Sequence, residues 1–135
     1  MDVLLDTCTF LWVIFDAPEL SDTARRLFQK PENKVFLSAA SSWELTIKQS
    51  LGRLSLPESA GAFVTSQREK HNIETLAITE AATFHLATLP LYHKDPFDRI
   101  IVCQAIEHSL VILTPDHLIS HYPVVPLVIK EEMLR

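Results

Sequence analysis

Three short apolar runs, separated by stretches with helical periodicity, constrain the fold of this chain more than any other feature. The runs cover residues 3–5, 35–37 and 110–113. Because each run is apolar at every position, it is typical of a strand that is covered on both faces. Parallel strands of this kind are joined by long crossovers, which are usually helices. The pattern therefore predicts an α/β domain with three layers, α/β/α, around a central, mainly parallel sheet.

The stretches between the runs supply the helices. Ser21, Ser38 and Thr79 are each placed to cap a helix at its N-terminus, and Gly52 is placed to end one. We expect helices over residues 7–15, 22–30, 40–51, 59–72, 79–86 and 97–108, and two more short strands over 73–78 and 124–125.

Length and composition fit one such domain. The chain has 135 residues, of which 47% are hydrophobic and 21% are charged, so it can build one core and has little room for a second. We expect a single domain over residues 1–135 that ends in a mobile tail over about 127–135, with its charges over 130–135. Cys8 and Cys103 are too few for a four-cysteine zinc site and imply no disulfide framework, which favours a reducing compartment.

The N-terminal residues do not resemble a targeting segment. No basic residue precedes the first apolar run, and Asp6 ends that run at once. No other apolar stretch approaches the length that a bilayer crossing needs. We therefore expect a cytoplasmic protein without a membrane partner.

Net charge alone weighs against nucleic acid as a partner. The formal charge is −5 and the isoelectric point is about 5.6, whereas phosphate binding normally calls for an excess of Lys and Arg. A bound divalent cation would reverse the local field if several acids converged on it. The positions of the acids therefore decide more than their number.

Two acids follow predicted strands. Asp6 comes directly after the strand over residues 3–5, and Asp116 comes three residues after the strand over 110–113. In an open parallel sheet, ligands bind beyond the carboxyl ends of the strands. We therefore expect these two carboxylates to lie close together.

A third acid lies in the first turn of a predicted helix. Asp98 shares one helical face with Ile101, Val102 and Ala105, and because that face is otherwise apolar we expect Asp98 to point inward. The alternative is that Asp98 only caps the helix, where an acid gains from the dipole and the unpaired N–H groups.

A fourth acid, Glu44, lies near the start of the helix over residues 40–51. Its neighbours Trp43, Ile47 and Leu51 predict the core-facing stripe, with Glu44 at its flank. Trp12 and Trp43 are accordingly expected in the core rather than as platforms for bases.

Four converging carboxylates indicate a metal site. Carboxylates that crowd together raise one another's pKa values unless a cation lies between them. Oxygen ligands suit Mg²⁺ or Mn²⁺ rather than zinc. Such an ion polarises a phosphoryl oxygen and lowers the pKa of an attacking water. The residues thus favour metal-dependent phosphotransfer or hydrolysis, without selecting RNA as the substrate.

With these acids placed, the chain resembles the PIN-domain ribonucleases of the VapC toxin class over nearly its whole length. The resemblance rests on four segments in family-like order, of which the third is the most specific. They are Leu4-Leu5-Asp6-Thr7 with Leu11-Trp12; residues 38–45 with Lys48, followed by 52–54 and Leu56-Pro57; residues 93–99 with Gln104-Ala105; and Thr114-Pro115-Asp116.

The resemblance implies a PIN-like fold and a function. It implies that four acids bind the metal and carry catalysis: Asp6, Glu44, Asp98 and Asp116. It also implies cleavage of RNA, toxin activity, a homodimer, and neutralisation by a small antitoxin encoded alongside.

Three more residues are implied to support the acids, and one residue departs from the pattern. Thr7 and Thr114 would support the acids, and Asp95 would lie behind them. Cys8 stands where His, Asn or a small residue is expected. We predict that its thiol is neither nucleophile nor ligand, because hard-metal chemistry activates water.

Other enzymes and modules fit the first strand less well. A haloacid-dehalogenase-type phosphatase needs Asp and Thr where this chain has Cys8 and Phe10. A receiver-type phosphoacceptor needs adjacent acids after its first strand, where the chain has Asp6-Thr7. A PIN fold that binds without catalysis stays open as an alternative.

Two further patterns are given structural roles. The spacing of His117 and His121 is helical, but we expect surface or packing roles rather than metal binding. Leu11, Trp12 and Phe15, with the amphipathic stretch over residues 22–30, offer an apolar surface for a partner helix.

Overall fold

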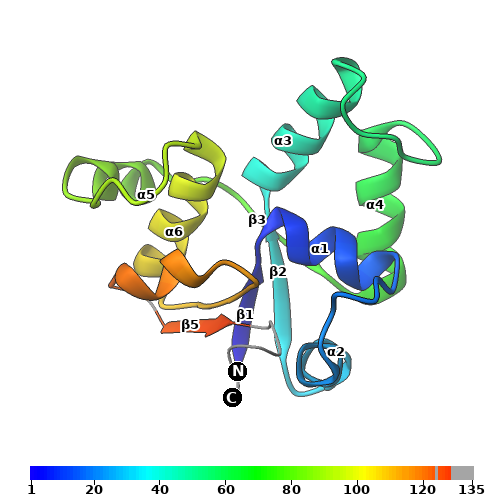
Figure 1. Cartoon of the computed structure of the whole chain (residues 1–135), viewed down its shortest axis with the longest axis horizontal. Coiled ribbons are helices and arrows are strands. Elements are labelled where there is room, and N and C mark those ends of the chain that lie inside the picture. The colour runs from blue at the N-terminus through cyan, green and yellow to red at the C-terminus, as the bar shows by residue number, and fades with distance from the viewer. Residues whose placement is uncertain (124, 129–135) are drawn as a thin grey trace.

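The sheet is parallel throughout. Figure 1 shows the computed structural model of the chain, which describes residues 1–123 and 125–128. Its strands follow the order β3-β2-β1-β4-β5, and each neighbouring pair runs parallel. The strands are β1 (Asp2–Leu5), β2 (Lys34–Ser38), β3 (Glu74–Leu76), β4 (Val111–Thr114) and β5 (Val125–Val128).

Helices connect these strands and cover both faces of the sheet (Figure 1). They are α1 (Thr7–Ile14), α2 (Asp22–Gln29), α3 (Ala39–Ser50), α4 (Ala60–His71), α5 (Glu80–Phe84) and α6 (Pro96–His108), with the 3₁₀ helices η1 (His85–Ala87) and η2 (His117–His121). Ser21, Ser38 and Thr79 accept main-chain N–H bonds as N-caps of α2, α3 and α5, as predicted. None of the described helices is both long enough and apolar enough to cross a membrane.

The central strand explains the three layers. Val3 and Leu5 of β1 belong to one buried cluster, which includes Phe63 of α4. Leu4, between them, belongs to a second cluster with Ile101 of α6. Because alternate side chains of a strand point to opposite faces, β1 is covered on both sides. The predicted α/β/α fold with its parallel sheet is therefore confirmed.

The buried face of α3 differs from the prediction. Trp43 and Leu51 are 57% and 60% exposed, so they do not form a core-facing stripe. The buried face instead carries Ala40, Ser41, Glu44 and Leu45. The physical reason is close approach: the small Ser41 lets α3 lie against α1, where Thr7 Oγ1 donates to Ser41 Oγ at 2.8 Å.

The two tryptophans also differ from each other. Trp12 is partly buried against the first core cluster, in line with the prediction. Trp43 packs edge-on against Phe97 at the surface, with the ring centroids 4.9 Å apart. The prediction of a core role for Trp43 was wrong.

The C-terminal segment matches the sequence expectations only in part. The strand expected over 124–125 corresponds to β5, and residue 124 lies outside the described residues. The tail expected over about 127–135 overlaps β5 at its first two residues, and the rest of it also lies outside them.

Candidate active site

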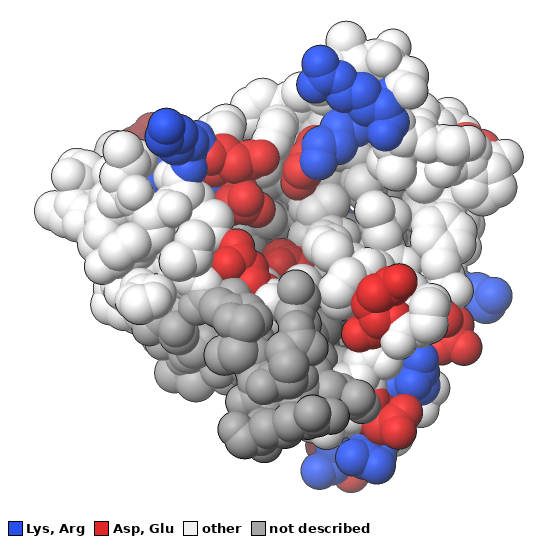
Figure 2. All heavy atoms as spheres, in the orientation of Figure 1, with Lys and Arg blue, Asp and Glu red and all other residues white. Residues whose placement is uncertain are grey.

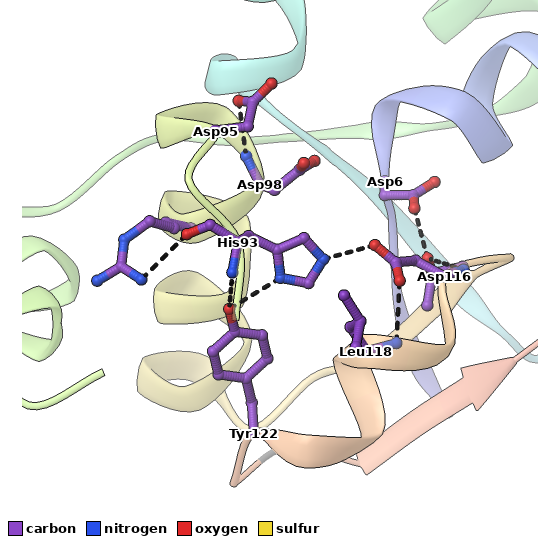
Figure 3. A network of polar contacts seen from close by, with 9 residues as sticks. Asp6, His93, Asp95, Asp98, Asp116, Leu118 and Tyr122 are labelled. Atoms are coloured by element: carbon purple, nitrogen blue, oxygen red, sulfur yellow. Dashed lines mark hydrogen bonds and ion pairs between the residues drawn. The ribbon is translucent and has the colours of Figure 1, made fainter. Parts of the chain in front are cut away.

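Two of the acids lie at the carboxyl ends of adjacent central strands. Asp6 ends β1 and caps α1, where its Oδ1 accepts from the Thr9 N–H at 2.8 Å. Asp116 follows β4 and caps η2 through the Leu118 N–H at 2.9 Å. Because β1 and β4 pair directly, Leu5 with Leu113, both carboxylates emerge at one edge of the sheet (Figure 3).

One hydroxyl group joins these two acids. Thr114 Oγ1 donates to Asp6 Oδ2 at 2.5 Å and accepts from the Asp116 N–H at 3.0 Å. Burial raises the pKa of Asp6, and the charge of Asp116 adds to that rise, while the hydrogen bonds from Thr114 and Thr9 oppose it. The charged form of Asp6 is thus destabilised by burial, although its hydrogen bonds fix the position of the carboxylate.

Asp98 does not cap its helix. The N-cap of α6 is Asp95, whose Oδ1 accepts from the N–H groups of Phe97 at 2.8 Å and Asp98 at 3.4 Å. Asp95, not Asp98, therefore caps the helix, and the Asp98 carboxylate is available to the candidate site. Burial raises the pKa of Asp98 to about 6, and the negative charges of Asp95 and Glu44 contribute to the rise.

Glu44 is the most enclosed of the four acids. Its side chain is 7% exposed, and its Oε2 lies 2.6 Å from Lys48 Nζ, one helical turn away. Its Oε1 is buried and has no hydrogen-bond partner within the described part of the chain. A buried oxygen without a partner costs free energy unless a ligand satisfies it.

Three of the acids line one pocket of about 330 Å³. Asp6, Glu44 and Asp98 lie in its wall, with Lys48 and Arg53 among the other lining residues. Figure 2 shows acidic side chains gathered in a hollow of this face, with basic side chains on its rim. Asp116 does not line this pocket and joins the cluster through Asp6 and His93.

The pocket is not a preformed metal cage. Across residues 1–123 and 125–128, no three carboxylate, imidazole or thiol groups converge closely enough to hold an ion. The donor set nonetheless fits a hard cation, because it consists of carboxylate oxygens and includes the unpartnered Glu44 Oε1.

The supporting residues have distinct contacts. Thr114 touches Asp6 directly, whereas Thr7 donates to Ser41 and so joins α1 to the helix that carries Glu44. Cys8 is exposed and lines the pocket. Cys103 is fully buried, as a small apolar side chain.

Sequence reasoning missed two residues of this site. Lys48 was noted only as part of a motif, although its i+4 spacing from Glu44 is the signal of a helical ion pair. His93 lies beside Asp116, with Nε2 2.5 Å from Oδ2, and no local spacing reveals a contact across 23 residues. For the histidines at helical spacing, His121 is exposed and its ring packs on Tyr92. The side chain of His117 lies outside the described residues.

Comparisons with known proteins agree with this fold. The PIN domain family matches residues 3–125 of the chain. Ribonuclease VapC16 of Mycobacterium tuberculosis is 32% identical over 69 residues, which are 51% of this chain and 49% of that protein. The chain thus aligns with about half the length of this curated relative.

Two solved structures share the architecture. VapBC2 of Rickettsia felis, bound to a promoter DNA fragment, superposes with a TM-score of 0.73 at 15% identity over 96% of this chain and 100% of that one. DNA-bound VapBC of Salmonella typhimurium gives a TM-score of 0.67 at 21% identity over 95% and 98% of the two chains. At these identities the likeness is one of fold.

Proposed function

Because this chain belongs to the PIN-domain family, we propose that it is a divalent-metal-dependent endoribonuclease that acts as the toxin of a toxin–antitoxin pair. One observation carries the proposal: Asp6, Glu44 and Asp98 come from three separate helix–strand units and line one pocket. The choice of RNA is supported by the ribonuclease relative, and the choice of partner by the VapBC complexes that share the fold.

The proposed metal site consists of Asp6, Glu44, Asp98 and Asp116, with Mg²⁺ or Mn²⁺ as the ion. Two features of the chain support it: the raised pKa of Asp98, about 6, and the unpartnered Oε1 of Glu44. Both are relieved by a cation that binds between the carboxylates. When bound, the ion supplies Lewis acidity toward a phosphoryl oxygen and acidity to a water.

The basic residues of the pocket take the substrate. Lys48 and Arg53 line the same hollow as the acids, so a phosphate that approaches the carboxylates meets positive charge on the way. Leu11 and Leu54 give the pocket an apolar wall. This arrangement answers the objection from the net charge of −5, because the field at the site differs from the average over the surface.

An RNA-cleavage assay tests the nuclease proposal. Wild type should cleave in MgCl₂ or MnCl₂ and lose activity in EDTA, and Asp98→Asn should be inactive under all conditions. Asp22→Asn is the matched control, since Asp22 is an exposed acid in the first turn of α2. Cleavage by Asp98→Asn at the wild-type rate contradicts the site assignment. Binding of RNA without cleavage by wild type favours the non-catalytic PIN module.

Expression in cells tests the toxin proposal. The chain alone should arrest growth, and coexpression with the small protein encoded beside it should restore growth. A harmless wild-type chain that forms no complex with that protein contradicts the toxin role and leaves the nuclease proposal standing. Because a toxin of this kind acts on the RNA of its own cell, we place the protein in the cytoplasm.

The partner surface is proposed at α1 and α2. Phe15 is 53% exposed beyond the end of α1, and Arg26, Leu27 and Lys30 line a depression of about 460 Å³ on α2. An amphipathic antitoxin helix fits such a surface, and an Arg or Lys beside it would neutralise the acidic pocket. We also propose a homodimer, which light scattering of the purified chain tests directly.

A further inference from the structure

His93 lies between two of the acids and has no part in the proposed function so far. Its side chain is 9% exposed and belongs to the segment between η1 and α6 (Figure 3). Arg99 of α6 holds that segment by donating to the carbonyl oxygens of Pro90 at 3.0 Å and His93 at 3.4 Å. These bonds fix the main chain that carries the imidazole.

The hydrogen bonds of the imidazole determine where its proton lies. Nε2 is 2.5 Å from Asp116 Oδ2, and because a carboxylate only accepts, Nε2 carries a hydrogen. Nδ1 is 2.8 Å from the hydroxyl oxygen of Tyr122. In the neutral ring Nδ1 has a lone pair, so the Tyr122 hydroxyl donates to it.

The Tyr122 hydroxyl is itself oriented. Its oxygen accepts from the main-chain N–H of His93 at 3.0 Å, which directs its own hydrogen toward Nδ1. The two rings stack with their centroids 5.5 Å apart, and Tyr122 is buried. If the neutral ring carries its hydrogen on Nε2, the Tyr122 hydroxyl donates to Nδ1 and Nε2–H donates to Asp116 Oδ2, so each donor has an acceptor.

The far end of this chain of hydrogen bonds is a proposed metal ligand. Asp116 Oδ2 accepts from His93, and Oδ1 accepts from the Leu118 N–H at 2.9 Å. Each carboxylate oxygen has a second lone pair, so both remain able to bind an ion. One donor to each of its two oxygens thus fixes the rotation of the Asp116 carboxylate, which lies beside Asp6 (Figure 3).

We propose that His93 is a positioning residue, whose Nε2–H, fixed by the Tyr122 hydroxyl, holds the Asp116 carboxylate in the orientation that binds the metal. The inference rests on the proposed function, since it assigns Asp116 to the ion. Substitution of a residue that hydrogen bonds to a metal ligand typically lowers metal affinity or activity by about 10–100-fold. His93 belongs to this class because it hydrogen bonds to Asp116, a proposed metal ligand.

Nitrogen NMR of the wild-type protein tests the proton position without any substitution. The ¹⁵N spectrum of an imidazole distinguishes a protonated from an unprotonated ring nitrogen, and we expect the neutral His93 ring to carry its hydrogen on Nε2. Tyr122→Phe removes the hydroxyl that donates to Nδ1, so it should shift the ring away from that tautomer. A neutral ring with its hydrogen on Nδ1 and a bare Nε2 overturns the inference, because Nε2 then has no hydrogen to donate to Asp116.

Calorimetric titration with MnCl₂ tests the effect on the metal. His93→Leu should weaken binding by about 10–100-fold. His93→Gln should recover most of that loss, because its amide N–H₂ reaches the position of Nε2. His85→Leu is the matched control: His85 faces Glu107 at 3.3 Å, away from the acid cluster, and its loss should leave Mn²⁺ affinity unchanged.

The outcomes separate this inference from the proposed function. If wild type binds no Mn²⁺, the proposed function fails and this inference fails with it. If wild type binds and His93→Leu binds equally well, only the role of His93 fails. Thermal melts check that each variant is folded. If His93→Leu does not fold, the Mn²⁺ affinity of His93→Gln and the ¹⁵N spectrum of the wild type still test the inference.

Discussion

The carboxylate of Glu44 is neutralised on one side only: Oε2 lies 2.6 Å from Lys48 Nζ, and Oε1 is buried without a partner among the described residues. Lys48 is half-exposed, so its ammonium group can leave Glu44 without crossing the core. The hydrogen bond that Lys48 donates to Glu44 raises the pKa of Lys48, which keeps the ammonium charged. Lys48 thus acts as a counter-ion for the buried Glu44 carboxylate.

Lys48→Met should therefore have opposite effects on stability and on metal affinity. Without metal, loss of the counter-ion leaves a buried charge and should lower the free energy of unfolding by about 1–2 kcal/mol. Metal binding should become about tenfold tighter, since a positive charge beside the ligands is gone. Urea denaturation in EDTA and calorimetry with MnCl₂ measure the two. Lys34→Met, at an exposed ion pair with Glu74, is the control, and weaker Mn²⁺ binding by Lys48→Met contradicts the counter-ion role.

The raised pKa of Asp98 makes metal-free stability depend on pH. Its folded pKa of about 6 exceeds the ordinary value of 3.8, so folding favours the protonated form. The stability from this group is complete below pH 3.8 and is lost as pH rises through about 6. Asp98→Asn should therefore be more stable than wild type at pH 8 by about 1–2 kcal/mol, after discounting for solvent, with little advantage at pH 4.

Urea denaturation in EDTA at pH 4, 6 and 8 measures this difference. MgCl₂ should reverse it at pH 8, because the ion stabilises only the wild-type carboxylate. An advantage of Asp98→Asn that is equal at all three pH values indicates a packing effect instead of a charge effect.

Asp6→Asn should retain the fold and lose the activity. Asn caps a helix about as well as Asp, so the bond from the Thr9 N–H survives. The variant lacks the negative charge that a metal ligand supplies, and the loss of RNA cleavage should exceed the 10–100-fold typical of residues behind a ligand. Single-turnover cleavage of RNA with matched circular dichroism spectra gives the answer, and near-normal cleavage removes Asp6 from the metal site.

Cys8→Ser should keep most of the activity. Cys8 is exposed at the pocket that contains Asp6, and the proposed chemistry uses water rather than a thiolate. The rate of RNA cleavage should change by less than about threefold, since a surface substitution is worth little free energy. A loss as deep as that of Asp98→Asn makes the thiol functional and requires a different mechanism.

Much of the fold was predictable because its signals are local. The apolar runs that became β1, β2 and β4 are buried on both faces, as is typical of parallel strands between two layers of helices. Asp6 and Asp116 were predictable as neighbours for the same reason, since each follows a strand at the same edge.

The rest depends on contacts that no local pattern encodes. The orientation of α3 is set by the approach of Ser41 to Thr7, which turns Trp43 outward although its spacing suits a core stripe. The role of His93 depends on Tyr122, 29 residues away, through a hydroxyl group that periodicity does not register. The role of a side chain that acts through a partner far away in the sequence can be recognised only in the folded structure.

The position of β4 has a consequence for the timing of activity during synthesis. β4 pairs with β1 in the middle of the sheet, yet it comes late in the chain, and it leads directly to Thr114 and Asp116. A ribosome-bound chain that ends before β4 therefore lacks the strand that flanks Asp6, the hydroxyl that orients it and the fourth acid. The acids can therefore come together only after β4, Thr114 and Asp116 have been synthesised.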